Sequence, residues 1–295
     1  MMNVRFGYGS PDHLREVPEI LRLAEQTDRD GLDLFSLSDH PYLPHLLDPY
    51  ATLSFVLGRT TRIAGLANVT NLPLRPAPVL ARTASSLTAI SGGRFVLGLG
   101  AGGAWDRIET MGVPRVRPAE AVKAFEQAMI LVRQLSGGGP AITDPYYGVT
   151  ALEPSQVPAP PIWTGSNGPK SLAATGRQAD GWIPGHAADW LSEIYRQARP
   201  IIDEAALSVG RKPSDVATIY NFPGRITAQP LDRVRDEDGR WIGGSPAQWV
   251  EELTGAVLDH GAAGFILFPR GSDPFETTLT RWSQEVVPAV RAAIG

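Results

Sequence analysis

A glycine-rich segment, Gly100-Ala101-Gly102-Gly103, directly follows the apolar run Arg94–Leu99. The run predicts a short buried strand, and the glycines leave the end of that strand without bulky side chains. Exposed backbone of this kind lets a flat or phosphorylated ligand approach closely. We therefore interpret this strand end as a candidate ligand-binding edge.

A pair of titratable residues, Asp39-His40, follows a second apolar run, Leu32–Leu37. A histidine exchanges protons near neutral pH and could act as general acid or base, with Asp39 orienting a neighbouring group. The structural alternative is that Asp39 caps or pins a loop while His40 only packs. The two residues by themselves leave both interpretations open.

A small polar turn, Thr164-Gly165-Ser166-Asn167-Gly168, opens a predicted helix. Unpaired backbone N–H groups and the positive end of a helix attract phosphate. The alternative is an ordinary helix cap built from Ser166 or Asn167.

The composition excludes several classes of protein. The 295 residues are 43% hydrophobic and 20% charged, with a net charge of −4, which is ordinary for a soluble globular protein. No basic run suggests nucleic acid, no apolar stretch suggests a membrane span, and the N-terminus lacks the pattern of a secretory signal. With no cysteine, the chain has no disulfide and no thiolate site, which fits a cytoplasmic protein. The five histidines form no metal-binding motif, so we predict no metal site.

Strands and helices are predicted to alternate along the whole chain. The strands are expected at Val4–Tyr8, Leu32–Leu37, Arg62–Val69, Arg94–Leu99, Pro161–Thr164, Gly181–Pro184, Val216–Phe222 and Gly264–Phe268. The helices are expected at Glu16–Arg29, Asp48–Gly58, Pro76–Ile90, Pro118–Leu135, Gly168–Ala179, Ala188–Leu207, Pro246–His260 and Asp273–Ile294.

Eight strand–helix units with continuously apolar strands are typical of a (β/α)8 TIM barrel. A doubly wound sheet is the alternative, but the first strand is not followed by G-x-G-x-x-G. We predict a single domain over residues 1–295, in which residues 137–161 and 224–244 are insertions in strand–helix connections. In such a barrel the strand ends named above meet at one mouth, where the active site lies.

An ordered set of short motifs resembles the luciferase-like flavin-dependent oxidoreductases, a family of bacterial luciferase-type monooxygenases and F420-dependent reductases and dehydrogenases. The matching stretches are Ala24-Glu25 with Gly31-Leu32-Asp33, Ser38-Asp39-His40, Asp48-Pro49-Tyr50, Thr60-Thr61-Arg62-Ile63, Arg75-Pro76 with Pro78, Leu87 with Ser91-Gly92-Gly93-Arg94 through Gly102, Gly165-Ser166, Ala179-Asp180-Gly181-Trp182 and Gly244-Ser245-Pro246 through Gly261.

The resemblance implies a flavin or deazaflavin at the barrel mouth and a non-prolyl cis peptide between Asn68 and Val69. It implies cofactor contacts from both residues, from the segment Gly100, Ala101 and Gly102, and, near the phosphate, from Gly165, Ser166, Asn167 and Gly168. His40 matches a histidine that F420-dependent members hold near the deazaflavin, so the resemblance implies a catalytic role for His40. We predict Asp39 as its catalytic partner from the Asp39-His40 pair itself. The resemblance also implies a homodimer.

The resemblance implies a redox enzyme, and within it Ser38-Asp39-His40 favours F420 over FMN, so we expect hydride transfer between F420 and a small organic substrate. The alternatives are an FMN-dependent monooxygenase supplied by a separate reductase, a flavin-binding relative without turnover, and a barrel hydrolase using metal or carboxylates. Gly103 stands where F420-dependent sugar-phosphate dehydrogenases of the family carry Glu, which weighs against that particular activity.

Overall fold

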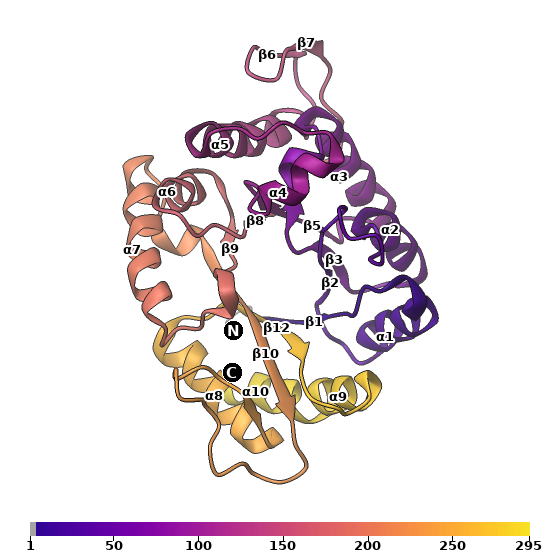
Figure 1. The fold of residues 1–295 in the computed structure, drawn as a ribbon, viewed down its shortest axis with the longest axis vertical. Coiled ribbons are helices and arrows are strands. Elements are labelled where there is room, and N and C mark those ends of the chain that lie inside the picture. The colour runs from indigo at the N-terminus through magenta and orange to yellow at the C-terminus, as the bar shows by residue number, and fades with distance from the viewer. Residues whose placement is uncertain (1–3) are drawn as a thin grey trace.

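Parallel strands close into an eight-stranded barrel in the computed structural model, which describes residues 4–295 (Figure 1). The barrel strands are β1 (Arg5–Gly9), β2 (Leu34–Leu37), β3 (Ala64–Ala67), β5 (Phe95–Gly100), β8 (Ile162–Thr164), β9 (Gly181–Trp182), β10 (Ala217–Ile226) and β12 (Gly264–Pro269). β10 pairs with both β9 and β12, which completes the ring. The predicted TIM barrel is confirmed.

Helices surround the barrel, and their caps follow from local sequence. They are α1 (Val17–Arg29), α2 (Pro49–Arg59), α3 (Ala77–Ser91), the short α4 (Trp105–Ile108), α5 (Pro118–Gln134), α6 (Pro169–Gln178), α7 (Glu193–Ser208), α8 (Pro246–His260), α9 (Phe275–Arg281) and α10 (Val287–Ile294). Asp48 caps α2 by accepting the Ala51 N–H at 2.9 Å. Gly92 ends α3 with a φ of 66°, a conformation that favours glycine.

Two predicted helices differ from those observed. The predicted Asp273–Ile294 helix is divided into α9 and α10 by the π-helical segment Trp282–Val286. Pro288 explains the break, because proline has no backbone N–H to donate within a helix and its ring clashes with the carbonyl group four residues earlier. The predicted Ala188–Leu207 helix begins only at Glu193, since Ser192 caps it through the Tyr195 N–H.

The apolar core includes an inner cluster, a larger outer one and a small third cluster around Trp182. Six strands contribute to the inner cluster, through Leu34, Leu66, Val96, Trp163, Ile219 and Ile266. Residues at alternating positions on the same strands, such as Phe35, Leu97 and Phe265, belong to the larger cluster with the helices. Packing on both faces explains why the strands are continuously apolar.

The two predicted insertions are both present. Residues 137–161 contain an antiparallel hairpin of β6 (Ile142–Asp144) and β7 (Val149–Leu152), which projects beyond α5 in Figure 1. The other insertion returns through β11 (Gly243–Gly244), which pairs with the extended end of β10. Arg235 secures this insertion by ion pairs with Glu252 and, at 2.6 Å, with Asp189.

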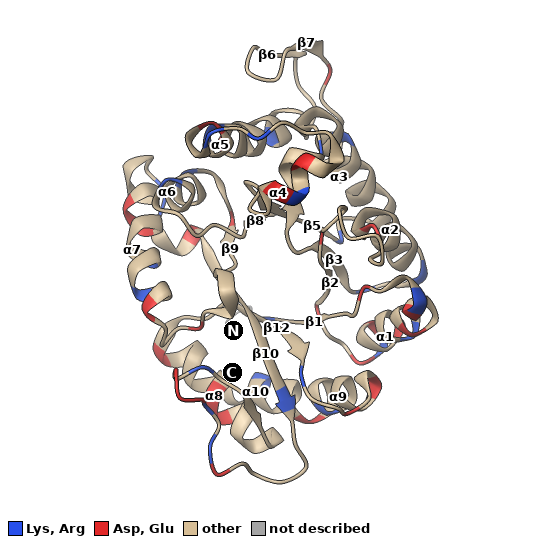
Figure 2. Cartoon of the chain, viewed as in Figure 1, with Lys and Arg blue, Asp and Glu red and all other residues tan. Residues whose placement is uncertain are grey.

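Charges of both signs are interspersed on the outer helices, while the barrel strands carry few (Figure 2). None of the helices within residues 4–295 is both long and apolar enough to cross a bilayer.

Candidate functional site

A cavity of about 420 Å³ lies among the ends of β2, β5 and β8. It brings together ten of the eleven residues that the sequence or the family resemblance marked: Asp39, His40, Val69, Gly100, Ala101, Gly102, Gly165, Ser166, Asn167 and Gly168. Tyr42, Asn71 and Trp105 also line it. Asn68 is not among the lining residues.

The Val69 side chain fills the space between two strand ends. The peptide bond from Asn68 to Val69 is cis, as the resemblance implied, and the chain then pairs with β5 through β4 (Thr70–Asn71). A Cβ atom at Gly100 would lie 3.0 Å from Val69 Cγ2, and one at Gly165 would lie 2.9 Å from it. Glycine at both positions therefore leaves room for Val69, and Val69 forms part of the cavity wall.

Asn68 makes its contacts on another side of the barrel mouth. Its Nδ2 donates to Oδ1 of Asn221, on β10, at 2.8 Å. Any contribution of Asn68 to the cavity thus comes through the backbone that places Val69.

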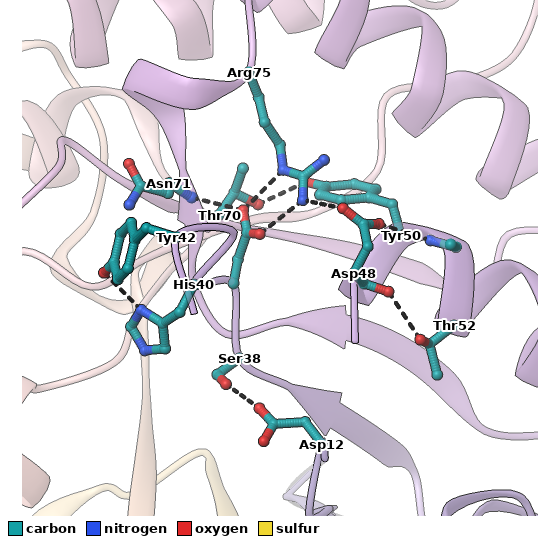
Figure 3. Close-up of polar contacts among 12 residues, drawn as sticks. Asp12, Ser38, His40, Tyr42, Asp48, Tyr50, Thr52, Thr70, Asn71 and Arg75 are labelled. Carbon is teal, nitrogen blue, oxygen red and sulfur yellow. Dashed lines mark hydrogen bonds and ion pairs between the residues drawn. The ribbon is translucent and has the colours of Figure 1, made fainter. Parts of the chain in front are cut away.

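Asp39 is a buried carboxylate whose oxygens are both engaged (Figure 3). Arg75 donates from Nε to Oδ2 at 2.8 Å and from Nη2 to Oδ1 at 2.7 Å, and the Asn71 backbone N–H donates to Oδ2 at 2.9 Å. This arrangement matches the loop-pinning alternative. It connects the end of β2 to the segment that follows Val69.

Arg75 extends the same network to α2. Its Nη2 pairs with Asp48 Oδ2 at 2.7 Å, and its guanidinium lies 4.4 Å from the centre of the Tyr50 ring. Burial disfavours the charge of Asp48, but hydrogen bonds from Arg75 and from the Ala51 backbone N–H, together with the charge of Arg75, outweigh burial and lower the pKa of Asp48. Arg75 is therefore the partner of two acidic side chains, Asp39 and Asp48.

His40 is exposed and belongs to the cavity wall. Its Nδ1 lies 2.8 Å from the hydroxyl of Tyr42 (Figure 3). Tyr42 belongs to none of the sequence motifs described above. The only signal was its position two residues after the histidine in a predicted strand–helix loop.

Within the described residues, no side chain caps the N-terminus of α6 with a hydrogen bond. Gly168 is the N-cap, while the Ser166 hydroxyl bonds to Thr175 Oγ1 at 2.9 Å and the Asn167 side chain lies against Gly185. The alternative of a cap built from Ser166 or Asn167 is therefore wrong. First-turn N–H groups of a helix have no partner within the helix, so this end of α6 suits an anion.

The wall formed by the segment after β5 is open and partly aromatic. Trp105 is half-buried and faces the cavity, and a Cβ atom at Gly103 would meet nothing within 4 Å. A cavity of this size, with glycine backbone on one side and an aromatic side chain nearby, suits a flat organic ring. Between residues 4 and 295, no three His, Asp or Glu side chains are grouped closely enough to hold a metal ion.

A family model described as luciferase-like monooxygenase matches residues 3–256. The chain belongs to this family. Its barrel and the cis peptide at the cavity agree with the earlier resemblance.

Similar proteins in the family include enzymes of two named activities. An F420-dependent hydroxymycolic acid dehydrogenase of Mycobacterium tuberculosis is 27% identical over 91% of this chain and 83% of its own length. A phthiodiolone/phenolphthiodiolone dimycocerosates ketoreductase of Mycobacterium bovis is 31% identical over 64% of this chain, which spans half of that relative's length.

A solved structure with the same fold is that of an F420-dependent secondary alcohol dehydrogenase in complex with an F420–acetone adduct. It matches with a TM-score of 0.79 and 18% identity, covering 98% of this chain and all of the other.

Proposed function

We propose that this protein is an oxidoreductase that binds coenzyme F420 and transfers hydride to or from a small organic substrate. The observation that carries the proposal is the cavity itself. Its wall contains His40, the glycines at the ends of β5 and β8, and the start of α6, which no described side chain caps. Named F420-dependent relatives support this choice of cofactor.

Different residues of the cavity would contact different parts of such a cofactor. Gly100, Val69 and Gly165 would face a flat ring, because their backbone and the Val69 methyls form the wall there. The N–H groups at the start of α6 would bind a phosphate. A bound deazaflavin supplies the hydride chemistry, and the protein contributes binding, orientation and exclusion of water.

Binding titrations with F420 and with FMN test the cofactor. We expect saturable F420 binding and much weaker FMN binding. The reverse preference would support the alternative of an FMN-dependent monooxygenase supplied by a separate reductase; the family description itself names a monooxygenase. Binding of neither compound would contradict both functions.

Turnover separates an enzyme from a flavin-binding relative without activity. We expect hydride transfer between F420 and at least one member of a panel of small ketones and alcohols. His40→Ala should reduce that turnover by about 10²–10⁴-fold if His40 acts as general acid or base. Unchanged turnover and cofactor affinity would remove His40 from the mechanism, and the proposed role of Asp39 is then confined to its contacts with Arg75 and Asn71.

We also propose that the chain forms a homodimer through α2 and α3, which lie side by side in Figure 1. Phe55 on α2 is 54% exposed, and Val79 and Ile90 on α3 are 62% and 69% exposed. Sedimentation equilibrium should give twice the chain mass, and Phe55→Glu with Val79→Glu should shift it to the monomer. A monomeric wild-type protein would contradict the proposal.

The location of this protein in the cytoplasm stays a prediction.

A further inference from the structure

The Tyr42 side chain lies between His40 and Asn71, with its hydroxyl toward His40 (Figure 3). The hydroxyl is 2.8 Å from His40 Nδ1, and the two rings have centroids 5.6 Å apart. Asn71 lies on the other side of Tyr42, and all three residues line the cavity. The positions of the protons on these side chains decide whether His40 presents a hydrogen-bond donor or an acceptor to the cavity.

Tyr42 is a neutral phenol at neutral pH. Burial raises the pKa of its hydroxyl above the ordinary value and the Asp39 carboxylate raises it further, while Arg107 and the Asn71 side chain oppose the rise. Because an unperturbed tyrosine already titrates near pH 10, the Tyr42 hydroxyl retains its proton and has one hydrogen bond to donate.

The surrounding groups direct this proton toward His40. The Asn71 side chain lowers the pKa of Tyr42. Asn71 Oδ1 is buried and has no partner among the described residues, so it does not receive the Tyr42 proton. Among the described residues, the ring nitrogen within hydrogen-bond distance of the hydroxyl is His40 Nδ1, at 2.8 Å.

We propose that Tyr42 is a positioning residue that holds neutral His40 as the Nε2–H tautomer. A neutral imidazole that accepts at Nδ1 carries its proton on Nε2. His40 then offers the cavity a hydrogen-bond donor rather than a base. Such a donor recognises an acceptor oxygen, as in the carbonyl of a ketone or aldehyde. The relevance to turnover rests on the proposed redox function, while the tautomer itself does not.

Nitrogen-15 NMR of the histidine rings at alkaline pH tests the tautomer on the full chain without added cofactor. His40→Gln identifies the His40 signals by their loss. We expect the wild-type signals to show a proton on Nε2 and a hydrogen-bonded acceptor at Nδ1. In Tyr42→Phe, we expect the Nδ1 signal to shift toward that of a ring nitrogen without a hydrogen-bond donor.

Tyr147→Phe is the matched control, because that hydroxyl donates to the Ala124 carbonyl at 2.7 Å, outside the cavity. It should leave the His40 signals at their wild-type positions. A proton on Nδ1 in the wild-type protein, or an unchanged Nδ1 signal in Tyr42→Phe, would overturn the proposal. Since no cofactor is added, failure of F420 to bind would count against the proposed function and leave this result standing.

Discussion

Arg75 holds Asp39 through two parallel hydrogen bonds, Nε to Oδ2 at 2.8 Å and Nη2 to Oδ1 at 2.7 Å. The carboxylate is fully buried, whereas the guanidinium retains 20% of its exposure. A paired arginine and carboxylate in this geometry are much harder to separate than a surface ion pair. This relationship joins the end of β2 to the segment that follows β4, beside the cavity.

Replacing Arg75 by Met should reduce the free energy of unfolding by about 3–5 kcal/mol, because it leaves the Asp39 charge buried without its partner. Urea denaturation measures the change. Arg59→Met is the control: its pair with Glu25 is partly exposed, and its loss should cost at most about 1 kcal/mol. Adding Asp39→Asn to Arg75→Met should recover part of the loss, since it removes the unpaired charge. Equal stability of the two single variants would contradict this account.

Gly165→Ala should weaken cofactor binding by roughly tenfold to a hundredfold, because the new Cβ would press on Val69 at 2.9 Å and overpacking costs about 1–3 kcal/mol. Gly103→Ala provides a control in the same cavity, where a Cβ meets nothing within 4 Å. Adding Val69→Ala to Gly165→Ala should restore part of the affinity by removing the methyl groups that clash. Titration of the variants with F420 measures all three effects. Normal affinity in Gly165→Ala would show that Val69 can move freely.

Gly176→Ala should destabilise the contact between α6 and α7, which are adjacent in Figure 1. A Cβ at this position would overlap the backbone carbonyl of Ile202, and backbone moves less readily than a flexible side chain. We expect the free energy of unfolding to fall by at least about 1–3 kcal/mol.

Gly58→Ala is the opposite case, since it lies in α2 with nothing within 4 Å of the added Cβ. It should raise stability by up to about 1 kcal/mol, because alanine favours helix. Thermal unfolding compares the two glycine variants directly. If Gly176→Ala had the same free energy of unfolding as the wild type, α6 and α7 would be able to move apart without loss of stability.

Asp28 should make the protein less stable in acid. Burial opposes ionisation of its carboxylate, but hydrogen bonds from the backbone N–H groups of residues 61–63 outweigh burial and lower the pKa of Asp28. A lowered pKa contributes stability above the unfolded value of about 3.9, and that contribution disappears as the pH falls through the folded value.

In Asp28→Asn, the free energy of unfolding should therefore depend less on pH below about pH 4 than in the wild type. Urea denaturation at a series of acidic pH values measures the slope. An unchanged slope would mean that the lowered pKa of Asp28 does not contribute to stability.

The order of the barrel elements could be predicted from local patterns. Each apolar run with its glycine or proline boundary depends on neighbours within a few residues, as at Gly92 after α3 and Pro49 in α2. Predicted and observed elements differ where a further local signal interrupts the periodic pattern, as Pro288 does in the terminal helix. The candidate cavity followed in the same way, because parallel strands in a closed barrel end at one mouth.

The sequence by itself therefore determined the barrel, its mouth and most of the residues that gather there. Tertiary structure decided what those residues contact. Asp39 and Arg75 are 36 positions apart, and the Val69 side chain packs between Gly100 and Gly165 from two other strands. Such contacts arise only when the ring of strands closes, since spacing along the chain sets local conformation but not which distant side chains meet. For the same reason, only the folded chain shows that Asp39 pins a loop.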